Sequence, residues 1–224
     1  MGILEMLFGK KKPKFSERIW LTKQGKITDL MNHVRNDQKC GLQSVVVTHF
    51  QDTLNTLLEA LNKEGVPLHI IKNSSQFPSG VPDMFNQKGQ VLVLASEAIP
   101  SFVTRAVSSQ PKNTALPPVS IHLAEHYPCL DRDHRVLDLD KVWPMKVEFT
   151  CYTSLDEPWL ASFGVDRIRE MLPKLGMSKE EVLEQPMLNQ SIQVAQKKMT
   201  QQVPHEQICE SCQEWVSKNV HHRS

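Results

Sequence analysis

An excess of charge of either sign is missing from this sequence of 224 residues. Its 26 Lys and Arg residues are balanced by 25 Asp and Glu residues, which leaves a formal net charge of +1. No overall field draws the protein to nucleic acid or to a membrane, so any electrostatic role must come from a local patch. Aromatic side chains for base stacking are also scarce, with two Tyr and four Trp. Nucleic acid is therefore not an expected partner.

A long hydrophobic run is missing as well. No uninterrupted apolar stretch approaches the roughly 20 residues that cross a bilayer, and the first residues do not resemble a secretory signal with a small-residue cleavage site. The odd number of cysteines, five, does not suggest a disulfide framework. We therefore expect a cytoplasmic protein in a reducing compartment, at most peripheral at the inner face of the membrane. The cysteines are Cys40, Cys129, Cys151, Cys209 and Cys212.

The N-terminal arm, residues 1–21, combines apolar and basic residues. Its first part, MGILEMLFGKKKPKF, places an apolar cluster before four lysines, a combination that can lie on an anionic lipid surface. Met6 stands where N-myristoylation requires Ser or Thr, so that lipid anchor is not expected. We expect a solvated arm or, alternatively, a weak contact with a membrane surface or a partner.

Five apolar runs of strand length are interspersed with amphipathic stretches. A helical spacing of apolar residues occupies 22–36 and 52–65, with Asp52 placed to cap the second helix and Gly65 to end it. Strands that are apolar on both faces and separated by helices imply a parallel sheet covered on both sides. The predicted fold class is therefore α/β. The expected strands are 44–50, 66–71, 90–96, 119–125 and 146–152.

The composition changes near Pro158. From there onward the sequence reads as helix only, interrupted near Pro173, Pro186 and Pro204. We therefore divide the chain into an N-terminal arm (1–21), an α/β domain (22–157) and a helical C-terminal extension (158–224).

The segment YTSLDEPWLASFGVDRIREMLPKLGM, residues 152–177, carries a family resemblance. It resembles the segment that closes the second motor domain of the SecA preprotein translocase ATPase family, where a last strand, a Ser-Leu-acidic turn and an FG…RI helix follow one another. SIQVAQKKM (191–199) is similar to the start of that family's long scaffold helix. QSVVVTHFQDTLNTLLEALNKEGVPLHIIKN (43–73) resembles the unit that opens the same motor domain. The resemblance implies a RecA-like fold, a parallel sheet of the helicase C-terminal type with a helical C-terminal extension.

The motifs for ATP chemistry do not accompany this resemblance. A RecA-type motor binds nucleotide between two domains, one with a Gly-rich phosphate loop and one with arginines. This sequence contains no G-x-x-x-x-G-K-[ST]. ASEAIPSFVTR (95–105) and RVLDLDKVWPM (135–145) stand where the family carries glycines and arginines. We therefore expect a degenerate motor domain that is not an enzyme, needs no cofactor and serves as an accessory or binding module for a SecA-like protein or another export component.

An alternative interpretation is that the chain retains part of a motor's ATP site. The chain would then be a trans-acting half motor that completes an ATP site with a partner subunit supplying the phosphate loop. In that case Arg105, Arg132 and Arg135 would be the nucleotide-binding residues.

A zinc site is the one metal centre that the sequence suggests. His205, Cys209 and Cys212, in HEQICESC, are spaced at i, i+4 and i+7, which is one face of a helix. Zinc would find three ligands there, with His221 or His222 as a fourth. The alternative is a buried cysteine face, since cysteine is often simply a core residue.

The helices after Pro158 are the predicted surface for a protein partner. Trp159, Phe163, Ile168 and Met171 recur at helical spacing and would present an apolar face. The alternative is that these side chains only cover the sheet. His122 and His126 lie near the end of the fourth predicted strand, where open α/β sheets bind ligands, and are either pocket residues or hydrogen-bonded structural residues.

Overall fold

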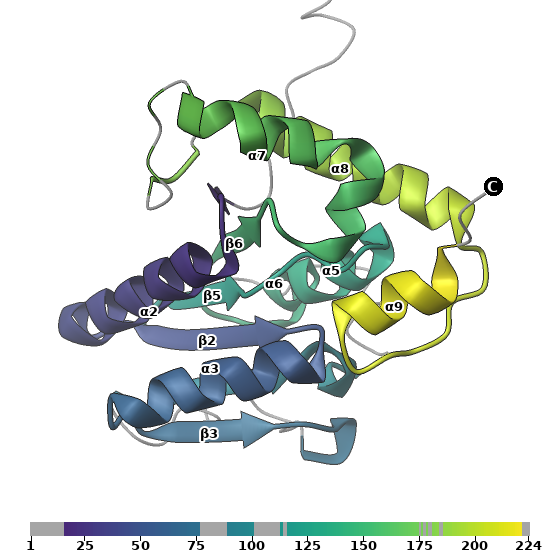
Figure 1. Ribbon diagram of the computed structural model, residues 1–224. Coiled ribbons are helices and arrows are strands. Elements are labelled where there is room, and N and C mark those ends of the chain that lie inside the picture. Colours follow the sequence, from purple (N-terminus) through teal and green to yellow (C-terminus); the bar gives the residue numbers. More distant parts are fainter. Residues whose placement is uncertain are drawn as a thin grey trace, which may run out of the picture.

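A six-stranded parallel sheet forms the centre of the protein (Figure 1). The computed structural model describes residues 16–76, 89–100, 113, 116–174, 176, 178, 181–183 and 186–220. Within these residues the strand order is β1-β6-β5-β2-β4-β3, and every neighbouring pair is parallel. The predicted α/β class with a parallel sheet is therefore confirmed. The strands are β1 Ser16–Trp20, β2 Gln43–Thr48, β3 Leu68–Ile71, β4 Val91–Ala95, β5 Val119–Leu123 and β6 Val147–Ser154.

Helices cover both faces of the sheet, which explains why the inner strands are apolar throughout. In Figure 1, α2 (Lys23–Cys40) and α3 (Gln51–Lys63) lie over one face, whereas α5 (Leu130–Leu137) and α6 (Leu139–Val142) lie behind the sheet. Successive strand residues point to opposite faces. Val46 accordingly joins the core under α2 and α3, while Val45 and Val47 join the core under α5 and α6.

Helix α2 rests on the sheet through polar as well as apolar contacts. Thr22 caps its start, accepting a hydrogen bond from the Gly25 N–H, and Gly41 ends it in the left-handed conformation. Three polar side chains, one turn apart on the helix, each reach a different strand. The pairs are Asp29 with the indole N–H of Trp20 (3.1 Å), His33 with the Tyr152 hydroxyl (2.5 Å) and Asp37 with the His122 imidazole (2.7 Å).

The predicted end of α3 is confirmed, but its predicted N-cap is wrong. Gly65 follows the helix with a φ of +67° and so ends it as predicted. Asp52 is not the N-cap: Phe50 occupies that position without a side-chain cap, and Asp52 lies in the first turn. A carboxylate in the first turn still interacts favourably with the helix dipole.

Strand β1 corrects the predicted arm of residues 1–21. Residues 16–20 pair in parallel with β6 and form an edge of the sheet, with Ser16 opposite Thr150. The strand was missed because Ser16, Glu17 and Arg18 interrupt the apolar pattern, and their partners lie far along the chain. Ile19 is fully buried and also forms an isolated antiparallel bridge with Leu183. Residues 1–15 lie outside the described part of the chain.

Helices follow Pro158, as predicted, but they pack directly on the sheet. They are η4 (Pro158–Phe163), α7 (Val165–Lys174), α8 (Pro186–Gln202) and α9 (Cys212–Asn219). Trp159 and Trp215 share one buried cluster with Ile19, Phe50 and Tyr127 at the strand ends. In Figure 1, α7 and α8 lie above the β1 and β6 edge, and α9 lies beside the arrowhead of β2. The elements after Pro158 therefore complete the core that the sheet begins.

In the part of the chain that the structure describes, no helix combines the length and the apolar character needed to traverse a bilayer.

Candidate functional site

The carboxyl ends of β2 and β5 form the position where an α/β sheet would bind a ligand. These strands are neighbours, yet β2 leads to α3 on one face and β5 leads to α5 on the other. Such a reversal opens a crevice beyond the strand ends, where open α/β sheets bind their ligands. His49 and Phe50 follow β2, whereas Glu125, His126 and Tyr127 follow β5. The ring of Tyr127 lies 5.4 Å from that of His49 and 5.3 Å from that of Phe50, measured between centres, so the two segments meet here and we take this crevice as the candidate site.

The buried carboxylate of Glu125 lies at the amino end of α3. One of its oxygens, Oε1, accepts the backbone N–H groups of His49 and Phe50, both at 3.1 Å. The other, Oε2, accepts the Thr53 hydroxyl at 2.5 Å. Free N–H groups at the start of a helix are a common anion-binding site. Here the carboxylate of Glu125 accepts the N–H of the N-cap residue Phe50 and that of His49 just before it.

Burial has the largest effect on the pKa of Glu125. Its pKa is raised because the carboxylate is desolvated, an effect only partly offset by the charge of Lys26 and the hydrogen bond from Thr53. Lys26 is itself buried and pairs with Glu157 at 2.8 Å. The ammonium group of Lys26 is thus paired with a carboxylate of the protein itself.

Asp133, on α5, is the second carboxylate of the crevice and the most heavily hydrogen-bonded. It accepts the Tyr127 N–H at 3.0 Å and the Gln196 amide at 2.7 Å. It also contacts the His126 imidazole, and its Oδ1 lies 2.8 Å from His49 Nε2. Burial alone would raise the pKa of Asp133, but the charge and hydrogen bond of His126, with the hydrogen bond from His49, hold it well below its usual range.

The predicted alternatives for His122 and His126 are resolved by burial. His126 is 1% exposed and His122 is 3% exposed. His126 contacts Asp133 through Nδ1 and Glu17 through Nε2, the latter at 2.6 Å. Desolvation lowers the pKa of His126, yet its acidic neighbours outweigh this and raise it well above the ordinary value. Both histidines are hydrogen-bonded structural residues, as the second alternative proposed.

The segment before α9 closes the crevice from outside. Glu206 accepts the Tyr127 hydroxyl at 2.9 Å and the Trp215 indole N–H at 3.3 Å, and it pairs with Arg132 at 2.7 Å. The Arg132 guanidinium lies 4.9 Å from the centre of the Tyr127 ring. Phe50 stacks on the same ring, with the ring centres 5.3 Å apart. The chain's own C-terminal region therefore fills the space above the strand ends.

A hollow of about 260 Å³ remains beside this cover. Its lining includes His49 and Gln51 from the sheet side and Ile208 from the covering segment. The carboxylates of Glu97 and Glu210 also line it. Two acidic side chains are an unfavourable lining for the phosphates of a nucleotide.

Two of the three arginines predicted for a half motor lie on α5 in the part of the chain that the structure describes. Arg105 lies outside the part of the chain that the structure describes. Arg132 is engaged by Glu206 and Tyr127, as stated above. Arg135 lies half-buried on α5, one helical turn further on. The nucleotide role of these residues therefore stays a prediction.

The predicted zinc ligands do not share a helix face. Residues 203–211 are not helical, and α9 begins only at Cys212, so the i, i+4, i+7 argument fails for His205 and Cys209. Helix α8 ends at Gln202, two residues before Pro204, because a proline cannot continue a helix. Among the described residues, these three do not form a group of mutually close ligand atoms. His221 and His222 lie outside the described residues.

The four residues predicted for partner binding divide into two pairs. Trp159 is fully buried, and its indole N–H donates to Glu157 at 3.1 Å, while Phe163 is partly buried in the same cluster. These two cover the sheet, as the alternative proposed. Ile168 is 36% exposed and Met171 is 55% exposed on α7. Only this second pair is available to a partner.

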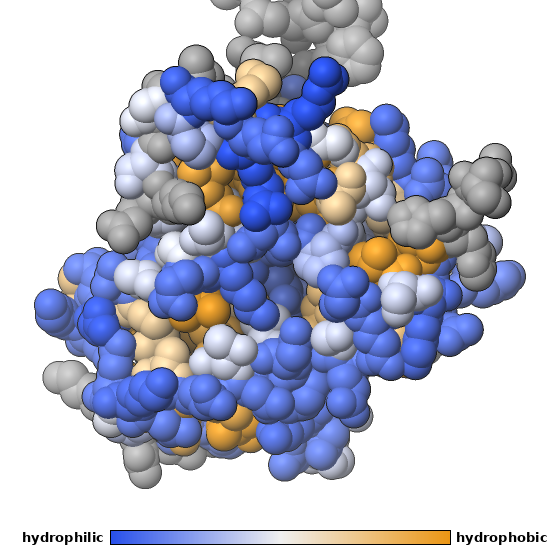
Figure 2. All heavy atoms as spheres, in the orientation of Figure 1, coloured by the Kyte–Doolittle hydropathy of each residue, from blue (hydrophilic) through white to orange (hydrophobic). Residues whose placement is uncertain are grey.

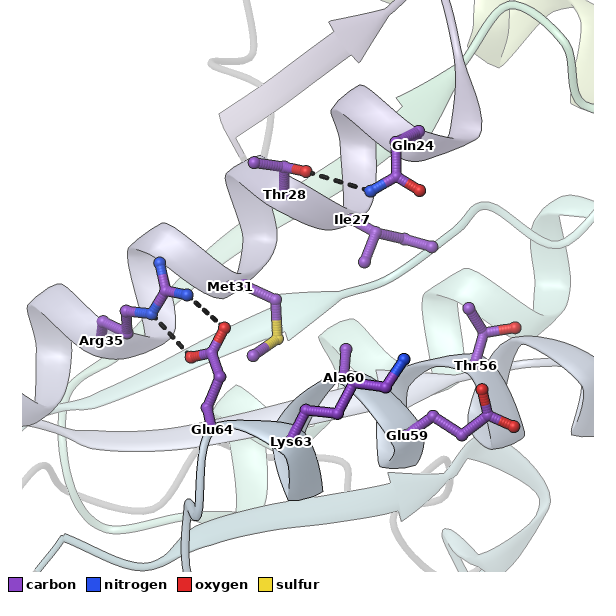
Figure 3. A pocket seen from close by; sticks show the side chains of 10 residues that line it. All are labelled: Gln24, Ile27, Thr28, Met31, Arg35, Thr56, Glu59, Ala60, Lys63 and Glu64. Atoms are coloured by element: carbon purple, nitrogen blue, oxygen red, sulfur yellow. Dashed lines mark hydrogen bonds and ion pairs between the residues drawn. The ribbon is translucent and has the colours of Figure 1, made fainter.

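A groove of about 440 Å³ lies between α2 and α3 (Figure 3). Ile27, Met31 and Ala60 lie between the two helices, and the Arg35–Glu64 ion pair bridges them at one end. Figure 2 shows that hydrophobic residues on this face form small separate areas among hydrophilic ones. The charged side chains of Glu59 and Lys63 also line the groove.

The sequence argument missed the acidic residues of the crevice. Glu125 was expected only as the last residue of a strand, Glu17 only as part of an arm, and Asp133 was given no role, although all three are buried. A usable signal is present for Glu125, because a carboxylate directly after an apolar strand must find donors when the strand end is covered. Nothing comparable marks Glu17, whose contact with His126 spans 109 positions.

Comparison with known proteins gives a limited similarity to SecA. The chain is 24% identical over 199 residues to the protein translocase subunit SecA of Salinibacter ruber, which covers 82% of this chain and 16% of that protein. It is 44% identical over 48 residues to SecA of Acidithiobacillus ferrooxidans, covering 21% of this chain and 5% of that protein. The chain thus spans a small part of the length of these relatives. No protein-family model matches it.

Among solved structures, the crystal structure of the C-terminal part of the Fun30 ATPase domain is similar at a TM-score of 0.41 and 13% identity. The match covers 79% of this chain and 54% of that one.

Proposed function

We propose that this chain is a non-catalytic, SecA-like module that acts by binding a protein partner connected with protein export. The similarity to SecA supports the connection with export. The observation that carries the non-catalytic part is the Glu125 carboxylate at the amino end of α3, bound by two backbone N–H groups and one hydroxyl. A nucleotide phosphate would have to displace a buried, hydrogen-bonded group of the protein itself.

The closed crevice supports the same proposal. Glu206 and Trp215 occupy the space beyond the strand ends, and Arg132 is directed to Glu206. A phosphate-binding loop is not present in the printed sequence. We therefore propose that the chain neither hydrolyses ATP nor needs a cofactor, and that it works in the cytoplasm or at the inner face of the membrane beside its partner.

Titration calorimetry with ATP and ADP in the presence of Mg²⁺ tests this proposal. The chain alone should give no binding heat, and a mixture with SecA from the same cell should give only the heat of SecA itself. Nucleotide binding by the isolated chain would overturn the proposal. Extra binding in the mixture that is lost on Arg135→Ala, but retained in Arg169→Ala on the exposed helix α7, would support the half motor instead.

The exposed part of α7 is the proposed contact for the partner. Ile168 and Met171 are large apolar side chains in water, one turn apart on one helix face. A Met171→Asp variant should weaken binding to an immobilised SecA-like partner at least tenfold. Gln201→Asp adds the same single negative charge at an exposed position near the end of α8 and serves as the control. Equal loss of binding in both variants would show a charge effect rather than an apolar contact.

A further inference from the structure

Three buried side chains with metal-binding atoms meet at the β1 edge of the sheet. Glu17 on β1 lies opposite Cys151 on β6, and His126 follows β5, the strand on the other side of β6. The ligand atoms of the three residues all lie within 4.8 Å of one another. The Cys151 sulfur is 3.3 Å from His126 Nε2, which in turn is 2.6 Å from Glu17 Oε1. Neighbouring parallel strands thus bring together three groups that are distant in sequence.

The kind of donor at each position matches what zinc takes. Thiolate, imidazole nitrogen and carboxylate oxygen are its usual protein ligands, with metal distances that separate tetrahedral ligand atoms by about 3.3–3.6 Å. The sulfur and the imidazole nitrogen already have this separation. The nitrogen and the Glu17 oxygen are at hydrogen-bond distance and would move apart by less than about 1 Å when a metal replaces the shared proton.

A second layer of contacts already orients the histidine. Asp133 holds His126 through Nδ1, which leaves Nε2 directed toward Glu17 and Cys151. Asp133 is in turn fixed by the Tyr127 N–H and the Gln196 amide. A carboxylate on the far nitrogen of a metal-binding histidine is the usual arrangement around zinc. The predicted trio near α9 has no such support among its described contacts.

We propose that Glu17, His126 and Cys151 form a structural zinc site that fastens the edge strand β1 to the centre of the sheet. The charges agree with this, because Glu17 and Asp133 place two carboxylates in one buried cluster where a divalent cation offsets them. This site is separate from the proposed export role and does not depend on it.

Zinc binding is coupled to the loss of protons, because the metal takes the thiolate form of cysteine and an imidazole nitrogen that carries no proton. At this site the metal would replace the protons held between His126 Nε2, Glu17 and Cys151. The affinity for zinc should therefore fall with decreasing pH.

Refolding the full chain with and without metal tests the proposal. The site is fully enclosed, so the protein is unfolded, freed of metal with a chelator and refolded in Zn²⁺ or Co²⁺. We expect one zinc ion per chain by native mass spectrometry and a raised melting temperature. The Co²⁺ form should show the near-ultraviolet charge-transfer band of a cobalt–thiolate bond.

Matched variants locate the metal. Cys209→Ser together with Cys212→Ser should retain the metal and the cobalt band. Cys151→Ser should lose the band, and Glu17→Gln, which keeps the shape of the side chain, should weaken zinc binding at least tenfold. Asp133→Asn should weaken it by about 10–100-fold, the usual effect of removing such a supporting carboxylate.

Three outcomes would overturn the zinc site. They are a wild-type chain that refolds without taking up zinc or cobalt, a cobalt band that survives Cys151→Ser, and a metal that is lost with Cys209 and Cys212. If Cys151→Ser does not fold, the wild-type stoichiometry and the Glu17→Gln titration decide the question by themselves.

Discussion

Replacing Glu125 by alanine should destabilise the fold by about 3–5 kcal/mol, which is a large part of the stability of an ordinary domain. The change leaves three buried donors without an acceptor: two backbone N–H groups at the amino end of α3 and the Thr53 hydroxyl. An unsatisfied buried donor costs about 1–3 kcal/mol, and rotation of the hydroxyl offsets part of the sum. Urea denaturation, followed by tryptophan fluorescence and circular dichroism, measures the loss.

Glu125→Gln is the matched variant. Its amide oxygen can still accept both backbone N–H groups, and it carries no desolvated charge, so we expect a loss of only about 1 kcal/mol. Formate or phosphate should stabilise the alanine variant and leave the wild-type protein unchanged, because only the variant exposes an empty anion site. An alanine variant within about 1 kcal/mol of wild type would refute the reasoning that this carboxylate occupies the crevice.

Three further predictions concern packing and charge. Trp215→Ala should cost about 3–5 kcal/mol in a denaturation experiment, since the side chain is fully buried over the strand ends; a loss below about 1 kcal/mol would mean that α9 does not cover the crevice in solution. Gly25→Ala should destabilise by about 1–3 kcal/mol despite the better helix propensity of alanine, because the new methyl group would lie 2.8 Å from the Trp20 ring; equal or higher stability would refute the close contact. The pKa of Asp133 is depressed in the folded state, so its stabilising effect is present above about pH 4 and is lost as the pH falls toward the depressed value. The stability difference between wild type and Asp133→Asn, measured by urea denaturation, should therefore be largest near neutral pH and shrink in acid; a difference that stays constant with pH would contradict this.

The inner strands were predictable because burial on both faces leaves a direct mark on the sequence. β2, β4 and β5 appear as short apolar runs, and each was placed to within about two residues. The edge strand β1 has no such mark, since Glu17 and Arg18 make half of it polar. Arg18 pairs with Asp29 on α2, and Glu17 contacts His126, which follows β5. These contacts exist only in the folded chain.

The candidate site was less predictable than the sheet for the same reason. The sequence showed that a phosphate loop was missing, but it did not show what occupies the crevice instead. Glu125 meets its donors 72 to 76 positions earlier in the chain. The helix-face argument for His205 and Cys209 failed because spacing alone does not establish that a segment is helical.

Among the described residues, the first strand, β1, pairs with the last one, β6. This pairing affects how the sheet can form during synthesis. Glu17 contacts Thr153, 136 positions later, so the first strand must wait for nearly the whole sheet to be synthesised. Until β6 has been made, β1 lacks its partner strand and β5 lacks the neighbour on its β6 side, and contacts this distant in sequence form slowly. A nascent chain of this protein therefore exposes an unfinished sheet edge for longer than a domain whose neighbouring strands follow one another, and chaperones would meet it in that state.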